Sequence, residues 1–148
     1  MPAYNKDRYF MNLASDIASD LTSFGGAKIA SVLVHKNQII SIGHNKQKTH
    51  PFAARFAKNP DSIYFHAEVN AIHNALRRHS EEELIKMKTT LYICRVKFDH
   101  ANATNLIWGM SKPCCGCDEA IEYFKINKVV YSLNEDDTLD KQYAIKFH

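Results

Sequence analysis

The sequence has few of the residues that mark fibrous, membrane or disulfide-bonded proteins. Its 148 residues include only 5 glycines, 4 prolines and 4 cysteines, which excludes a collagen-like chain and argues against a disulfide framework. No apolar stretch approaches the ~18 residues that a membrane-spanning helix needs. Residues 1–8 contain no apolar core of the signal-peptide kind. We therefore expect a protein of the cytoplasm that has no membrane partner.

A strong charge of either sign is also absent. The formal net charge is +3, and the basic residues form no dense run beyond Arg77-Arg78. Because nucleic-acid surfaces are strongly basic, we do not expect nucleic acid as a partner, whereas a small anionic substrate is compatible with this charge. The hydrophobic content of 45% and the charged content of 24% are ordinary for a globular protein. The length suits one domain, residues 1–148.

Two short motifs contain the residue types that catalytic zinc requires. His66 belongs to a His-x-Glu motif, and Cys114 and Cys117 follow Pro113 in a Pro-Cys-x-x-Cys motif. A catalytic zinc ion takes three protein ligands and keeps a fourth position for water. His66, Cys114 and Cys117 supply three ligands, so we predict a Zn2+ cofactor. Bound zinc lowers the pKa of water, which provides a nucleophile near neutral pH.

The pair of motifs is typical of zinc-dependent nucleobase deaminases. In such an enzyme the glutamate of the first motif has a role other than metal binding. Removing an amino group from a cytosine requires protons at the ring nitrogen and at the departing amine, and a carboxylate beside the metal can carry both. Glu68 is the predicted proton carrier. In mid-helix, His66 and Glu68 would diverge by about 200°, so we expect them at a helix start.

A Cys-x-x-Cys pair also occurs in structural zinc knuckles and in redox pairs. A structural site needs a fourth protein ligand, which here would be Cys94, Cys115 or another histidine. Cys115 adjoins Cys114 and is expected to point away from the metal, and Cys94 lies in a predicted strand. A redox pair would give His66 and Glu68 no role. We favour catalytic zinc, with a non-catalytic, zinc-stabilised binding module as the alternative.

The apolar pattern predicts alternating helices and strands, and therefore an α/β fold whose mixed sheet contains parallel pairs, with helices on its faces. A further helix is expected to have Pro113 in its first turn. The two helices that carry the metal motifs follow strands, so their amino ends can meet. The other predicted elements are helices over 5–24, 62–79, 81–87 and 138–148 (with an edge strand as the alternative for the last), strands over 29–35, 39–43, 89–96 and 128–132, and a loop over 98–110.

The motifs and their order are similar to those of the cytidine and deoxycytidylate deaminase superfamily, most like short phage-type deoxycytidylate deaminases. The resemblance covers about residues 29–132, and it implies a three-layer α/β/α sandwich, a homo-oligomer and hydrolytic deamination of dCMP to dUMP and ammonia. The matching segments are Gly43-His44-Asn45, His66-Ala67-Glu68 with Asn70-Ala71-Ile72, Lys112-Pro113-Cys114…Cys117, and Lys128-Val129-Val130-Tyr131.

The resemblance also implies substrate contacts. The side chain of Asn45 would bind the sugar and the main chain of Ala67 would bind the base. The residues themselves suggest three more candidates. Lys48 and Arg55, in the loop over 46–62, are either contacts for a substrate phosphate or part of a solvated loop face, and Trp108 either covers the base or packs in the core. Deamination of another nucleoside, nucleotide or base stays open. A tRNA adenosine substrate is less favoured, because the acidic residues 135–137 would repel a phosphate backbone.

Overall fold

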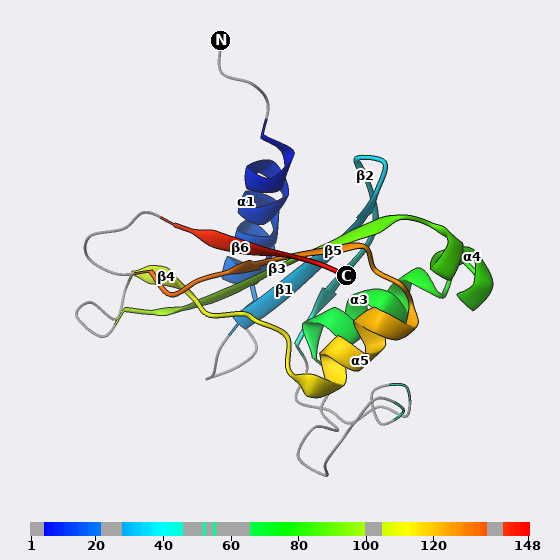
Figure 1. The fold of residues 1–148 in the computed structure, drawn as a ribbon. Helices are drawn as coiled ribbons and strands as arrows, with labels where there is room; N and C mark the ends of the chain where they lie inside the picture. The colour runs from blue at the N-terminus through cyan, green and yellow to red at the C-terminus, as the bar shows by residue number, and fades with distance from the viewer. Residues whose placement is uncertain are drawn as a thin grey trace.

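The computed structural model describes residues 5–21, 28–45, 52, 55, 66–99, 105–135 and 141–148. These residues form a three-layer α/β/α sandwich, as predicted. One face of a mixed sheet carries α1 (Lys6–Ser19), and the other carries α3 (Ala67–Ala75) and α5 (Cys115–Tyr123) (Figure 1). A short helix, α4 (Glu81–Lys86), begins with the capping box that its sequence predicts, between Ser80 and Glu83. No helix among the described residues is long and apolar enough to span a membrane.

The sheet runs in the order β2-β1-β3-β5-β6, and β4 also pairs with β3. β3 and β5 are parallel, and the other described pairs are antiparallel. β1 borders one edge of β3, while β5 and β4 share its other edge in succession. The strands are β1 (Lys28–His35), β2 (Gln38–His44), β3 (Thr89–Phe98), β4 (Leu106–Gly109), β5 (Lys128–Ser132) and β6 (Tyr143–Phe147).

One predicted element is wrong, and for a second the stated alternative is the form observed. Residues 106–109 were predicted as loop but form β4, which pairs with the last four residues of β3, Arg95–Phe98. Residues 143–147 form the edge strand β6 rather than a helix, because the exposed edge of β5 offers a full set of backbone partners from Lys128 to Ser132. The aromatic and β-branched residues of β6 favour that pairing. Both differences concern short segments whose structure depends on pairing with the strand that precedes them.

Each face of the sheet has its own hydrophobic cluster. The α1 face is also held by polar contacts. Asp7 accepts a hydrogen bond from the Tyr92 hydroxyl at 2.7 Å and pairs with Lys128 at 2.9 Å. The indole nitrogen of Trp108 donates to the Ser15 hydroxyl at 2.8 Å. Helix α1 therefore covers the face opposite to the helices that carry the metal motifs, consistent with the packing role predicted for it.

Replacing Asp7 by alanine should lower the free energy of unfolding by about 2–3 kcal/mol, because Tyr92 and Lys128 would lose a shared, largely buried partner. Urea unfolding followed by circular dichroism measures this loss. Asp16 lies on the exposed side of the same helix, so Asp16→Ala is the matched control and should change stability by less than about 0.5 kcal/mol. Equal losses in the two variants would show that the Asp7 contacts contribute nothing specific.

Candidate metal centre

The three predicted ligands meet where two helices begin. His66 is the N-cap residue of α3, Cys114 is the N-cap residue of α5, and Cys117 lies in the first turn of α5. The His66 Nδ1 atom is 3.2 Å from Cys117 Sγ and 3.5 Å from Cys114 Sγ. All three ligand atoms lie within 4.8 Å of one another. The two helices run side by side on one face of the sheet (Figure 1).

This arrangement fits a zinc ion. With bond lengths of ~2.1 Å to nitrogen and ~2.3 Å to sulfur, a tetrahedral site separates these atoms by roughly 3.6 Å. The measured nitrogen–sulfur separations of 3.2 and 3.5 Å are close to that value. Cys117 is only 2% exposed, whereas Cys114 is exposed, so the group is open to solvent on one side. An open side is what a three-ligand catalytic site needs.

A fourth protein ligand is not found within the part of the chain that the structure describes. The ligand group there consists of His66, Cys114 and Cys117. Cys94, one candidate fourth ligand, belongs to the cluster on the α1 face. Burial raises the pKa of its thiol to about 12, so it stays a neutral, unreactive side chain. The structural-zinc alternative thereby loses one of its named ligands.

The pKa values of the two thiols of the centre are shifted in opposite directions. A hydrogen bond from Cys117, and a second from His66, lower the pKa of Cys114 to about 3. The same contact with Cys114, followed by burial, raises the pKa of Cys117. The hydrogen bond with Cys114 also raises the pKa of His66. A thiolate is thus present at neutral pH, and thiolate is the form that binds metals. Complete ligation then releases the remaining protons.

Glu68 lies in the first turn of α3, beside the ligand group and outside it. Its side chain is 6% exposed. Burial raises the pKa of this carboxyl, while hydrogen bonds with Cys117 and with its own backbone amide act in the opposite direction. A buried carboxyl with a raised pKa is suited to taking up and releasing protons near neutral pH. His66 precedes the helix, which removes the angular conflict expected between His66 and Glu68 in mid-helix.

Serine hydroxyls attach α3 to the two strands beneath it. The Ser31 hydroxyl of β1 donates to the Ala67 carbonyl at 2.6 Å, and the Ser41 hydroxyl of β2 donates to the Ala71 carbonyl at 2.7 Å. Both carbonyls lie in the helix that follows His66. The donors come from different strands, so they restrain the rotation as well as the height of the helix above the sheet. His66 and Glu68 are positioned by these contacts.

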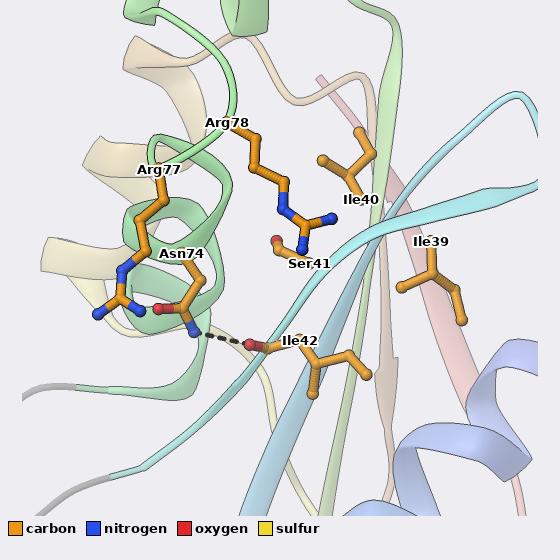
Figure 2. A pocket seen from close by; sticks show the side chains of 7 residues that line it. All are labelled: Ile39, Ile40, Ser41, Ile42, Asn74, Arg77 and Arg78. Carbon is orange, nitrogen blue, oxygen red and sulfur yellow. Dashed lines mark hydrogen bonds between the residues drawn. The ribbon is translucent and has the colours of Figure 1, made fainter.

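Two asparagines of α3 complete the attachment from the helix side. Asn70 accepts a hydrogen bond from the His44 backbone amide at 3.0 Å, and the Asn74 amide donates to the Ile42 carbonyl at 2.8 Å (Figure 2). β2 is an edge strand, so these backbone groups have no neighbouring strand to pair with. Sequence reasoning gave the asparagines no such role, although their i,i+4 spacing on an apolar helix was a usable signal.

Gly43 lets the helix approach the strand this closely. A Cβ atom at this position would lie 2.3 Å from the Ala71 backbone nitrogen and 2.5 Å from the Ala67 carbonyl oxygen. Both are backbone atoms of α3, so no side-chain adjustment could relieve the overlap. A residue with any side chain at position 43 would push the helix, and with it His66, away from the sheet.

A hollow of about 380 Å3 lies between β2 and the carboxyl end of α3, away from the end at which His66 lies. Figure 2 shows isoleucines of β2 on one side and Asn74, Arg77 and Arg78 on the other. None of its lining residues is a predicted zinc ligand or Glu68. This hollow is therefore separate from the candidate centre.

One of the predicted substrate contacts is corrected by the structure. Trp108 is fully buried in the cluster on the α1 face, so the prediction that it covers the base is wrong and its packing alternative is confirmed. Arg55 pairs with Glu81 at 3.0 Å and lies 4.7 Å from the ring centre of Tyr123. Tyr123 is roughly 9 Å along α5 from Cys117. Arg55 thus has an ion-pair partner on α4, and its contact with a substrate phosphate stays a prediction.

The other three predicted contacts keep their status as predictions. Asn45 extends the pairing of β2 with β1: its side-chain oxygen accepts from the Ile29 amide at 3.0 Å, and its own amide donates to the Ile29 carbonyl at 3.1 Å. Ala67 begins α3, and His66 provides no side-chain cap for the first-turn amides. Lys48 lies outside the described residues.

Comparison with known proteins identifies the class. Residues 4–133 match the family model described as the cytidine and deoxycytidylate deaminase zinc-binding region. The chain belongs to this family, and the model's description supports the zinc cofactor. A search among curated protein sequences gives no match.

Solved structures show the same fold at low sequence identity. The dCMP deaminase of cyanophage S-TIM5 in its apo form is 20% identical, with a TM-score of 0.54 over 88% of this chain and 84% of that one. The same enzyme in complex with dCMP and dUMP gives 17% identity and a TM-score of 0.52, over 88% and 83% of the two chains. Cytidine deaminase from Burkholderia pseudomallei is 14% identical, with a TM-score of 0.53 over 93% and 90%.

Gly43→Ala should lower the free energy of unfolding by about 1–3 kcal/mol, because the new methyl group overlaps the α3 backbone. It should also weaken zinc binding, because the helix that carries His66 must move. Thermal unfolding and a zinc competition titration measure the two effects.

Gly109→Ala is the matched control for that substitution. The atoms nearest to a Cβ atom there are side-chain carbons of Arg95 and Lys97 at 3.3 Å, which need to shift by only a few tenths of an ångström, so both properties should change far less than in Gly43→Ala. If Gly43→Ala were as stable and bound zinc as tightly as the control, the close approach of β2 to α3 would not position the centre.

Proposed function

We propose that the protein is a zinc-dependent hydrolase that converts dCMP to dUMP and ammonia. The observation that supports this most directly is the group of His66, Cys114 and Cys117, whose ligand atoms lie within 4.8 Å of one another, next to the buried carboxyl of Glu68. Membership of the deaminase family supports the reaction class. The choice of dCMP is supported by the sequence resemblance to the deoxycytidylate branch.

The residues of the centre divide the chemistry between them. His66, Cys114 and Cys117 would hold the zinc ion, which supplies a water molecule activated for attack when it is bound. Water adds to C4 of the cytosine, and the amine leaves as ammonia. One proton of the water ends on the ring nitrogen N3 and the other leaves with the amine. Glu68 would carry both protons in turn, because one buried carboxyl beside the metal can accept and release each of them.

Three contacts would orient the substrate. The Asn45 side chain would bind the sugar, the main chain at Ala67 would bind the base, and Lys48 would meet the phosphate. The position of Ala67 supports its role, because it starts a helix that lacks a side-chain cap. We further propose that residues 1–148 act as one domain, that the protein works in the cytoplasm, and that it forms a homo-oligomer, as the family resemblance implies.

The substrate is tested by an ultraviolet assay of the purified protein with dCMP, deoxycytidine, CMP, cytosine and adenosine. We expect the spectral change of deamination with dCMP. Turnover of cytidine derivatives without dCMP would keep the reaction class and replace the substrate, an alternative compatible with the structural likeness to a cytidine deaminase. Turnover of none of them by zinc-loaded protein would contradict the proposal.

Glu68→Gln should lower the turnover number by about 10²–10⁴-fold, because the amide keeps the shape of the side chain and removes the proton carrier. Zinc content should stay unchanged, since Glu68 lies outside the ligand group. Glu119 is exposed on α5, and Glu119→Gln is the control that should keep full activity. A Glu68→Gln variant with ordinary turnover would remove Glu68 from the mechanism.

Chelation distinguishes the enzyme from the zinc-stabilised binding module. A strong zinc chelator should abolish activity while circular dichroism still reports folded protein, because the hydrophobic clusters on the two faces of the sheet consist, apart from Cys117, of side chains that are not predicted ligands. Added zinc should restore the activity. Unfolding that coincides with zinc removal would favour the structural module instead.

A further inference from the structure

Strand β3 shares one edge between two partners. β5 pairs with residues Thr90–Ile93, and β4 pairs with residues Arg95–Phe98. The two ladders therefore meet at Cys94, and the backbone groups on either side of the junction are the Ile93 carbonyl and the Arg95 amide. Buried backbone groups of this kind need partners from outside the ladders.

Two serine hydroxyls provide these partners. The Ser132 hydroxyl accepts a hydrogen bond from the Arg95 amide at 3.1 Å and donates to the Gly109 carbonyl at 2.7 Å. The Ser111 hydroxyl donates to the Ile93 carbonyl at 3.0 Å and accepts from the Ser132 amide at 2.8 Å. The side chain of Ser132 is 0% exposed and that of Ser111 is 7% exposed. The pair thus joins β3, β4 and β5 through buried contacts.

The junction lies immediately before the cysteine motif. The chain leaves β4 at Gly109, passes through Ser111 and reaches Cys114 at the start of α5. The Ser111 backbone amide also donates to the Ser132 carbonyl at 3.0 Å. The preceding Met110 amide donates to the Asn134 side chain at 2.9 Å. The connection is therefore fixed to the sheet three residues before the first cysteine ligand.

We propose that Ser111 and Ser132 are positioning residues for the metal centre, an inference that rests on the proposed zinc site. They set the place of Cys114 and Cys117, while the contacts of α3 with β1 and β2 set the place of His66 independently. The nitrogen–sulfur separations of 3.2 and 3.5 Å depend on both attachments at once. Loss of either serine hydroxyl would let the start of α5 shift relative to His66.

The experiment compares zinc affinity and Co2+ absorption spectra of the full chain and its Ser111→Ala and Ser132→Ala variants. Contacts that orient metal ligands typically contribute 10–100-fold to affinity, so we expect zinc binding weakened by about that factor. The cobalt–thiolate absorption should change in shape, because it reports the geometry of the two sulfurs. Ser111→Thr keeps the hydroxyl and should restore both the affinity and the spectrum.

Ser15→Ala is the matched control. It also removes a serine hydroxyl from a hydrogen bond, the one donated by Trp108 on the α1 face, so it lowers stability without touching the connection to α5. Zinc affinity in Ser15→Ala should equal that of the unmodified protein. If Ser132→Ala does not fold, Ser111→Ala provides the test, because it leaves the contacts of Ser132 with Arg95 and Gly109 in place.

The outcomes separate the two proposals. Unchanged zinc affinity and an unchanged cobalt spectrum in both alanine variants would overturn the positioning role. Equal weakening in Ser15→Ala would also overturn it, because general destabilisation would then explain the effect. An unmodified protein that binds no zinc would instead refute the zinc site on which the inference rests.

Discussion

The close contact between α3 and the edge of the sheet is the constraint on which the candidate centre depends. His66 precedes the helix and has no side-chain capping contact of its own, so its place is set by how the helix lies on β1 and β2. Only a glycine at position 43 permits this approach, and the contacts of Ser31 and Asn70 set its orientation. Because the ligand atoms must meet within a few tenths of an ångström, a small displacement of α3 would disperse them.

On the cysteine side, too, side chains form hydrogen bonds with backbone groups of the sheet that have no strand partner. A sheet leaves backbone groups without strand partners wherever a strand is at an edge or where two ladders meet, and other parts of the chain can supply the missing hydrogen bonds. The edge of β2 receives them from asparagines of α3, and the junction on β3 receives them from Ser111 and Ser132. Asn70 and Asn74 belong to the helix that follows His66, and Ser111 belongs to the segment that leads to Cys114. Stability of the sheet and geometry of the centre are therefore coupled.

The ligand set and most elements could be predicted from sequence, because a His-x-Glu motif and a Cys-x-x-Cys motif are local patterns with a specific chemical meaning. The bounds of β5, residues 128–132, were also predicted as observed. Strand β4 could not be, and β6 was only the alternative to a helix, since each forms by pairing with the preceding strand rather than from a clear pattern of its own. Trp108 and Arg55 were assigned to the substrate from residue type alone. Their actual contacts with Ser15 and Glu81 exist only in the folded chain.

The central claim is that His66, Cys114 and Cys117 bind one zinc ion and leave a position open for water. X-ray absorption at the zinc edge of the purified protein tests this claim most directly, because it counts sulfur and lighter ligands around the metal. The account predicts two sulfur ligands at about 2.3 Å and two nitrogen or oxygen ligands at about 2.1 Å. Three or four sulfur ligands would contradict it, since the site would then be closed by protein and unable to bind a water molecule.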